Sequence, residues 1–430
     1  MDAVDARTVI AEVWRREAAK IIAVLTRVVR DVGLAEELAQ DALVAALSTW
    51  PRDGVPDRPG AWLLTTARNR ALNTLRRRKV SDRVHGTMAT MAEDDPHDAR
   101  LAEVQAAIDR LDEAVDDDVL RLMFIACHPI LSKESRVALT LRLLGGLTTE
   151  EIARAFLAAE SAVAQRIVRA KRTLAEAGVA FELPPAAELG PRLASVLEVV
   201  YLIFNEGYVA TAGDEVMRPA LQGEALRLGS MLAALAPAEP EVHGLCALMS
   251  LQASRAAART DARGEPVLLL DQDRGRWDRA AIARGLAALE AAEALGGPPG
   301  PYRLQARIAA CHARATTADA TEWPAIAAIY GELAALCPSP VIELNLAIAV
   351  SRAEGPAAGL DRLDRLAAEP SLARYHLVPS ARADLLERLG RREEARAEFE
   401  RAAALTDNAR QRRRLLERAA ACADHDDPDA

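Results

Sequence analysis

One segment of the chain carries residue types that suit contact with a polyanion. Between residues 61 and 79, apolar residues recur at helical spacing and no carboxylate interrupts the opposite face. A solvated helix face normally mixes both signs, because opposite charges four residues apart attract each other. Arginines, amides and hydroxyls without acids favour phosphates and base edges, although a merely soluble arginine-rich face is the alternative. The predicted nucleic-acid face consists of Trp62, Thr65, Thr66, Asn69, Arg70, Asn73, Arg76 and Arg77.

The segment in front of this face is predicted to be a rigid loop. From about Pro51 to Pro59 it is rich in proline, glycine and aspartate. A loop at this place could hold a base that has left its stack, and Trp62 could stack on that base. Trp62 is equally consistent with an ordinary core anchor, and both interpretations stay open at this point.

A second candidate DNA-binding element spans residues 147–173. Thr148 followed by Glu151 predicts a capping box that starts a short helix, and a turn near residues 157–160 leads into a second helix. The positions predicted to face inward on the second helix are Val163, Ile167, Ala170 and Leu174. The positions predicted to face outward are Ser161, Ala162, Gln165, Arg166, Arg169, Arg172 and Thr173. Small residues followed by glutamine and arginine suit a helix that enters a major groove, although αα-hairpins also occur without DNA.

Two further strings stand out by composition: FNEGY at residues 204–208 and DQDRGRWDR at residues 271–279. Asn205 and Glu206 are candidates for capping a helix or bridging to a neighbouring domain. The second string could form a ligand or partner site. A loop closed by its own salt bridges and pinned by Trp277 is the favoured interpretation. Its aspartates do not make a calcium loop, because the glycine and the distal glutamate of such a loop are missing.

The elements that must position these residues are helical throughout, because alanine, leucine, arginine and glutamate dominate the chain. Gly355 and Gly390 stand 35 residues apart in two similar segments, close to the period of about 34 residues of a helix–turn–helix repeat. We therefore predict an all-α protein. Its parts are a three-helix domain over residues 1–80, a flexible linker over 81–98, a helix-turn-helix domain over 99–180 and a tetratricopeptide-like helical extension over 181–430.

Composition argues against several classes of protein. The net charge is −9, so the basic segments are local and bulk affinity for nucleic acid is not expected. Five scattered cysteines without a CxxC or Cys–His cluster indicate a reducing compartment, with neither a disulfide framework nor a zinc site. The sequence offers no membrane span and no leader, which predicts a cytoplasmic protein without a membrane partner. Without metal-ligand spacing, a nucleophile elbow or a phosphate loop, we expect no cofactor and no enzyme activity.

The first 180 residues resemble sigma-70 family factors of the extracytoplasmic-function (ECF) group. AEELAQDALVAALSTW at residues 35–50 and PGAWLLTTARNRALNTLRRRK at residues 59–79 resemble the second domain of that family. Residues 99–178 resemble its fourth domain, and no third domain lies between them. The implied partners are core RNA polymerase, through the clamp coiled coil of its largest subunit and its flap, and promoter DNA.

The resemblance also assigns roles to individual residues. The residues implied to dock on the clamp coiled coil are Glu36, Glu37, Leu38, Gln40 and Asp41, for which an ordinary solvated helix face is the alternative. The loop at 51–59 and the predicted nucleic-acid face would contact and melt the −10 element. The helix beginning at Ser161 would read the −35 element as a duplex.

The extension resembles that of an ECF subgroup with a C-terminal tetratricopeptide-like domain. The matching strings are RLASVLEVVYLIFNEGYVATAG at 192–213, VLLLDQDRGRWDRAAIARGL at 267–286 and the terminal repeats. The implied protein directs promoter-specific initiation, while intramolecular contact with the extension regulates or supports it. The alternative is a helix-turn-helix regulator that never docks on polymerase and whose repeat domain binds a peptide or small-molecule effector. The sequence does not identify the promoter, the inducing signal, any ligand of the extension or the oligomeric state.

Overall fold

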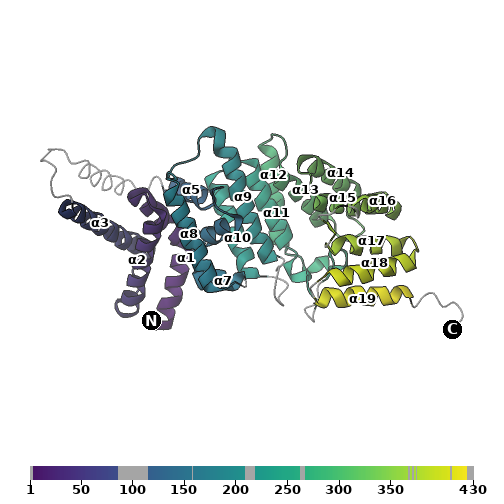
Figure 1. Cartoon of the computed structure of the whole chain (residues 1–430), viewed down its shortest axis with the longest axis horizontal. Coiled ribbons are helices and arrows are strands. Elements are labelled where there is room, and N and C mark those ends of the chain that lie inside the picture. The colour runs from purple at the N-terminus through teal and green to yellow at the C-terminus, as the bar shows by residue number, and fades with distance from the viewer. Residues whose placement is uncertain are drawn as a thin grey trace. The chain divides into compact units, whose positions relative to one another are not determined.

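The computed structural model divides the chain into two compact units, Met1–Leu235 and Ala236–Ala430 (Figure 1). The described residues are 3–85, 115–156, 158–208, 218–261, 267–366, 369, 372–373, 375–406 and 409–423. Within these ranges the chain forms helices and no β-strand, which confirms the predicted all-α class.

The first three helices of the first unit pack against one another as a small bundle. They are α1 (Ala3–Val29), α2 (Val32–Asp53) and α3 (Pro59–His85). The chain turns between α1 and α2 at Arg30, whose φ of 55° is left-handed, and Asp31 then caps α2 by accepting the Leu34 N–H. The α2 side of the bundle is closely packed because its buried positions are mostly alanine.

Two boundaries differ from the sequence prediction. Helix α2 continues through Pro51 and ends at Gly54, which has a φ of 90° and donates its N–H to the Trp50 oxygen. Glycine therefore ends this helix instead of proline, and the predicted 51–59 loop shrinks to residues 54–58. Helix α3 runs to His85, since no glycine or proline occurs between Gly60 and Gly86, and so enters the predicted 81–98 linker. The remainder of that linker lies outside the described residues.

A helix-turn-helix domain follows in the same unit. Its helices are α5 (Val115–Ala126), α6 (Lys133–Leu143), α7 (Thr149–Ala155) and α8 (Glu160–Glu176). The predicted capping box is present: Thr148 accepts the Glu151 N–H, and the Glu151 carboxylate accepts the Thr148 N–H. Helices α7 and α8 pack against each other, and α8 also packs against α6.

The first two helices of the extension belong to this first unit. Helix α9 (Ala186–Tyr208) packs on α5 and α6, and α10 (Pro219–Leu235) packs on α9 and contacts α5. Three side chains bind backbone oxygens of the helix-turn-helix domain: Arg192 binds that of Phe124 at 2.9 Å, Ser195 that of Cys127 at 2.6 Å and Arg227 that of Leu144 at 2.5 Å. The extension predicted over 181–430 is therefore divided between the two units.

The second unit is a series of helices that pack on their neighbours in the sequence. They are α11 (Pro240–Ala253), α12 (Arg279–Ala294), α13 (Pro301–Arg314), α14 (Trp323–Leu336), α15 (Pro340–Ala353), α16 (Pro356–Leu366), α17 (Leu377–Arg388), α18 (Arg392–Leu405) and α19 (Ala409–Ala423). Short 3₁₀ turns at Ala256–Ala258, Leu269–Asp271 and Arg274–Arg276 connect α11 to α12.

The repeat predicted from the sequence forms two helix pairs, α15 with α16 and α17 with α18. Gly355 and Gly390 occupy equivalent turns with φ values of 107° and 77°, a conformation that residues with a Cβ rarely adopt. Ala395, Phe399 and Ala402 of the second copy are fully buried, as the small-and-large packing pattern of this repeat requires.

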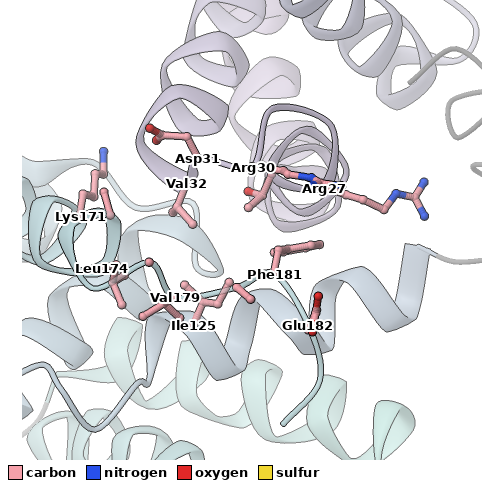
Figure 2. Close-up of a pocket in the computed structure, with 14 residues that line it drawn as sticks. Arg27, Arg30, Asp31, Val32, Ile125, Lys171, Leu174, Val179, Phe181 and Glu182 are labelled. Carbon is pink, nitrogen blue, oxygen red and sulfur yellow. The ribbon is translucent and has the colours of Figure 1, made fainter. Parts of the chain in front are cut away.

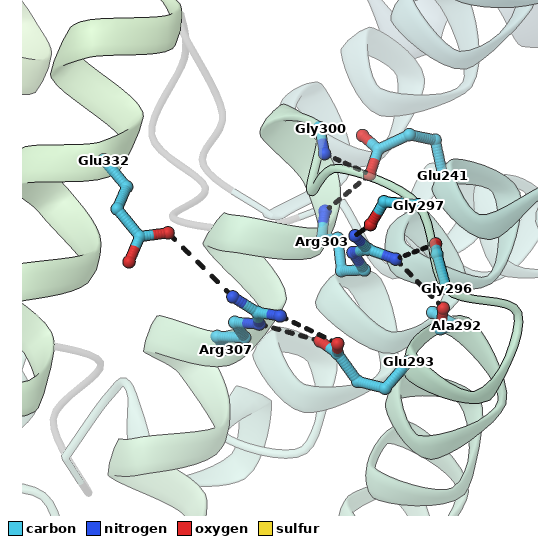
Figure 3. A network of polar contacts seen from close by, with 9 residues as sticks. All are labelled: Glu241, Ala292, Glu293, Gly296, Gly297, Gly300, Arg303, Arg307 and Glu332. Carbon is cyan, nitrogen blue, oxygen red and sulfur yellow. Dashed lines mark hydrogen bonds and ion pairs between the residues drawn. The ribbon is translucent and has the colours of Figure 1, made fainter.

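A buried arginine and a carboxylate hold the turn between α12 and α13 (Figure 3). The Arg303 residue is only 1% exposed, and its guanidinium donates to the backbone oxygens of Ala292 (3.1 Å), Gly296 (2.8 Å) and Gly297 (2.6 Å). From α11, Glu241 accepts N–H groups at the start of α13. Both helix ends are thereby supplied with partners that the helices themselves lack.

We expect Arg303→Met to lower the free energy of unfolding by about 3 kcal/mol, because three oxygens at a buried helix end lose their donors. Arg307→Met is the matched control, since Arg307 pairs with Glu293 at the surface and its loss should cost less than about 1 kcal/mol. Urea denaturation followed by circular dichroism measures both. Equal losses would contradict the capping role of Arg303.

Candidate nucleic-acid interface

The predicted nucleic-acid face lies on α3, opposite a buried stripe of Leu63, Ala67 and Ala71. The exposed members of the face are Thr65, Asn69, Asn73 and Arg76, and the half-buried members are Trp62, Thr66 and Arg70. The side chain of Arg77 lies outside the described residues. The helical periodicity therefore separated the two faces of α3 correctly.

Trp62 contacts a second tryptophan of the same bundle. Its ring lies edge-on to that of Trp50, with the ring centroids 5.5 Å apart, and Trp50 is fully buried. This contact supports the anchoring interpretation of Trp62. The side chain remains partly exposed at the end of the five-residue 54–58 loop, so one part of it is accessible from solvent.

The residues implied to dock on polymerase do not share one environment. Glu37 and Asp41 are exposed on α2 and Gln40 is half-buried, whereas Leu38 is part of the core of the first unit. Glu36 is only 2% exposed. In this conformation, therefore, Glu36 and Leu38 offer no surface to a partner.

Two exposed apolar residues continue the accessible side of α2. Val44 is 62% exposed and Leu47 is 42% exposed, and they follow Glu37 and Asp41 at intervals of three to four residues. Sequence reasoning missed them because an apolar side chain on a helix is usually assigned to the core. Asp41 also forms an ion pair with Arg70 of α3 at 3.1 Å, which joins this side of α2 to the nucleic-acid face.

Helix α8 buries one side and exposes the other. The buried residues are Val163, Ile167, Ala170 and Leu174, as predicted from the sequence. Of the predicted outward positions, Ser161, Ala162, Gln165, Arg169 and Arg172 are exposed, and Arg166 and Thr173 are half-buried. Val168 lies among them and is 64% exposed, a position that sequence reasoning did not single out. The Val168 side chain is of the kind that can make an apolar contact with the methyl group of thymine in a major groove.

Glu36 is surrounded by cations of the helix-turn-helix domain. Its carboxylate accepts a hydrogen bond from Arg142 Nε at 2.5 Å and forms an ion pair with Lys171 of α8. Gln40 also donates to it. We call Glu36, Arg142 and Lys171 the buried charge cluster. Burial lowers the pKa of Lys171 to about 8 and also lowers the pKa of Arg142.

Other contacts join the three-helix bundle to the helix-turn-helix domain within the first unit. Helix α1 packs on α5, where Arg27 pairs with the fully buried Asp118 at 3.2 Å. Burial raises the pKa of Asp118, and the neighbouring arginines act in the opposite direction. A pocket of about 520 Å³ lies at this junction, and Figure 2 shows Lys171 and Phe181 among the side chains that line it.

The FNEGY string bridges two parts of the first unit. Glu206 forms an ion pair with Arg218, whose guanidinium also binds the backbone oxygen of Ala155 at the end of α7. Gly207 allows close approach to α10, because a Cβ there would collide with the backbone of Gln222. This arrangement agrees with the predicted bridging role of Glu206.

The DQDRGRWDR string is a structural loop, but its own charges do not pair as the sequence suggested. Asp273 and Asp278 accept backbone N–H groups, because Asp273 caps the 3₁₀ turn Arg274–Arg276 and Asp278 caps α12. Arg274 is buried, stacks on Trp277 at 4.7 Å and donates to the His312 and Ala315 oxygens. The loop is pinned by Trp277 as expected, through arginine–backbone contacts instead of internal salt bridges.

The described residues offer neither a membrane-spanning helix nor a cluster of metal ligands. No helix in the described part of the chain is long and apolar enough to cross a membrane. Among the same residues, no group of three or more histidine, cysteine, aspartate or glutamate side chains could hold a metal ion.

Family comparisons match three segments of the chain. Sigma-70 region 2 matches residues 13–80, and Sigma-70, region 4 matches residues 121–174. The family of unknown function DUF6596 matches residues 192–293, from α9 to α12. No solved structure matches the chain.

Individual relatives cover either most of the chain or its first part. An uncharacterized protein of Rhizobium meliloti is 45% identical over 386 residues, which cover 90% of this chain and 89% of that protein. The ECF RNA polymerase sigma factor SigK of Mycobacterium sp. is 30% identical over 33% of this chain and 68% of its own length. The probable ECF RNA polymerase sigma factor SigI of Mycobacterium tuberculosis is 25% identical, over 41% and 58% respectively.

The exposed face of α8 gives a direct test of DNA contact. We expect Val168→Glu to weaken binding to duplex DNA at low salt about tenfold, because a carboxylate replaces an apolar contact near phosphates. Val44→Glu is the matched control, with the same substitution at a similarly exposed site on α2. Fluorescence anisotropy with a labelled duplex measures both affinities. Equal losses would show that only net charge matters and that α8 is not the contact.

Proposed function

The chain belongs to the extracytoplasmic-function group of the sigma-70 family, and on that premise we propose that it initiates transcription through three separate surfaces. One surface binds core RNA polymerase, one melts the −10 element and one reads the −35 element. The observation that carries the proposal is that region 2 and region 4 match the two domains that bear these surfaces. None of the three functions requires a chemical reaction at a residue of this chain.

The polymerase surface is the accessible side of α2. Glu37 and Asp41 suit an arginine-bearing partner helix, and the adjacent Val44 and Leu47 supply apolar area that is exposed in the free protein. Together they form a stripe with an acidic and an apolar part. A clamp coiled coil with basic and apolar side chains is the kind of partner that such a stripe fits.

The −10 surface is the face of α3. Its exposed amides and hydroxyls can bond base edges, and its arginines can bind phosphates because residues 61–79 of the helix include no carboxylate. Melting then follows from trapping a non-template base outside its stack, which costs a few kcal/mol that protein contacts must offset. The 54–58 loop and the accessible part of Trp62 are the places for such a base.

The −35 surface is the outer side of α8. Small residues at its start allow close approach to the DNA, and Gln165, Val168 and Arg169 follow one turn later. Arg169 donates to Gln165 at 3.0 Å, which orients both side chains outward before DNA arrives. The pair can present donors and an acceptor to base edges in the major groove.

The extension has two roles in this proposal. Helices α9 and α10 and the residue directly before α10 brace region 4, because Arg192, Arg218 and Arg227 bind its helix-end oxygens. The second unit is then the part that regulates or supports the sigma domains, through contacts that are made within the chain.

Substitutions on α3 separate melting from polymerase binding. We expect Asn69→Asp with Asn73→Asp to reduce promoter-specific transcript at least about tenfold, since two carboxylates would face the DNA backbone. Arg70 is left intact because it pairs with Asp41 of the polymerase surface. Gel-filtration binding to core polymerase should be unchanged, and Gln252→Glu with Gln411→Glu, both in the second unit, controls for two added negative charges. A parallel loss of polymerase binding would show that this face is not the DNA surface.

Truncation tests what the extension contributes when the chain is ended at the boundary between the two compact units. A chain that ends at Leu235 keeps α9 and α10 on region 4, whereas a chain that ends at Ala180 loses both. We expect only the longer form to melt cooperatively, because the shorter one exposes region 4 core and leaves helix-end oxygens without donors. Thermal denaturation measures this, and run-off transcription with the longer form then reports the effect of the second unit. Equal melting of both forms would contradict the bracing role.

A further inference from the structure

The pocket of about 520 Å³ in the first unit lies where the end of α1 and the start of α2 meet the end of α8 and the connector that follows it (Figure 2). Its volume is typical of sites that hold small ligands. Connector residues 178–182 form one wall, and they lie between the segments that match Sigma-70, region 4 and DUF6596. The pocket belongs to none of the three surfaces of the proposed function.

Backbone hydrogen bonds fix the connector wall. Gly178 has a φ of 61° and donates its N–H to the Ala175 oxygen at 3.1 Å. The Val179 N–H donates to the Leu174 oxygen at 3.2 Å. These two bonds form a Schellman motif, in which the residue after the glycine commonly packs on the residue whose oxygen it binds. Val179 and the buried Leu174 both line the pocket, so the motif that ends α8 also builds this wall.

The apolar part of the pocket is only partly covered. Its side chains come from α2, α5, α8 and the connector: Val32, Ile125, Leu174, Val179 and Phe181. Val32, Val179 and Phe181 are half-buried, and Figure 2 shows the two connector side chains across the pocket from Val32. A ligand with an apolar body would remove their remaining exposed area from water.

Three of the charged side chains around the pocket are already engaged. Arg27 pairs with Asp118, and Lys171 pairs with Glu36 in the buried charge cluster. Asp31 accepts a backbone N–H as the cap of α2. Because each of the two cations is matched by a carboxylate, they add little net charge for a ligand.

The two remaining charges have opposite signs. Arg30 and Glu182 line the pocket, and both are exposed. Within the described part of the chain, neither side chain forms a hydrogen bond or an ion pair. The pocket therefore offers a ligand one cation, one carboxylate and an apolar surface.

The backbone conformation of Arg30 is an independent observation. Its φ of 55° is left-handed, and among the described residues it is the one position with a positive φ that is not a glycine. Glycine adopts this conformation without strain, whereas a residue with a Cβ adopts it at an energetic cost. Because the Arg30 side chain makes no polar contact with the described residues, its presence at a strained position points to a use in binding.

We propose that this pocket binds a small zwitterion with an apolar body, of the size of a free apolar amino acid or a dipeptide. Arg30 binds the carboxylate of the ligand, because a guanidinium can donate two parallel hydrogen bonds to it. Glu182 binds the ammonium group, and the negative charge of Asp31 supports it. The apolar side chains of the pocket accept the body of the ligand. Binding involves no reaction, and it does not depend on the proposed function.

Calorimetric titration of the full chain with phenylalanine and with the dipeptide phenylalanyl-leucine tests the ligand class. We expect at least one of them to bind with one molecule per chain, and the comparison separates an amino-acid site from a dipeptide site. The N-acetyl form lacks the ammonium group and the C-terminal amide lacks the carboxylate, so each should bind at least about tenfold more weakly. Equal affinity for the zwitterion and both blocked forms, or no binding of either zwitterion, would overturn the proposal.

Substitutions assign the two charged contacts. Arg30→Gly should weaken binding of the zwitterion about tenfold but leave binding of its amide unchanged, because the amide does not use the guanidinium. Glu182→Gln should do the same for the zwitterion and leave the N-acetyl form unchanged. Arg284→Gln, at an exposed site on α12, controls for the lost positive charge and should have no effect.

Thermal denaturation of the same variants separates binding from a structural role. The melting temperature of Arg30→Gly should not fall, since glycine accepts the left-handed backbone. A lower melting temperature together with unchanged affinity for the zwitterion would show that Arg30 is structural and would overturn its role in binding. Run-off transcription does not enter this test, so a failure of the proposed function would leave its outcome intact.

Discussion

The oxygens at helix C-termini impose the constraint on which this structure depends. An all-α chain ends many helices inside its own packing, and each end leaves carbonyl groups without intrahelical donors. With few aromatic side chains to fill such places, arginine supplies both bulk and donors. Arg227 serves the end of α6, Arg218 that of α7 and Arg303 that of α12. Several arginines that look like surface charge in the sequence are therefore parts of the interior.

This use of arginine explains why the first two helices of the extension, α9 and α10, pack as part of the first unit. Arg192 of α9, Arg227 of α10 and Arg218 just before α10 reach the helix ends of region 4, and each contact replaces water that the packed helices exclude. Region 4 of this chain is thus completed by residues beyond its own family boundary at residue 174. A boundary drawn from the resemblance alone, at residue 180, cuts through a packed interface.

The features that could be predicted from the sequence are those that depend on helical periodicity and on local capping. The buried side of α8, the capping box at Thr148 and the glycine turns of the repeat are decided within a few residues of the chain. Contacts between distant segments gave no such signal. Arg274 binds the oxygen of His312, 38 residues away, and Glu36 binds Arg142, 106 residues away. The polar surfaces were therefore located correctly on α3 and α8, whereas the burial of Glu36 was not foreseeable.

Under the proposed function, the charge distribution suits a protein that binds DNA only together with polymerase. With a net charge of −9, each basic surface is small, and neither α3 nor α8 alone can hold a duplex tightly at physiological salt. In the proposed function, polymerase would change this by fixing both surfaces on one partner, so that the second contact becomes intramolecular and the two weak affinities multiply. Acidic residues elsewhere in the chain would then lower the affinity for promoter DNA only a little, but they would disfavour binding to bulk DNA. A protein of this kind gains specificity from geometry, because only correctly spaced elements engage both surfaces at once.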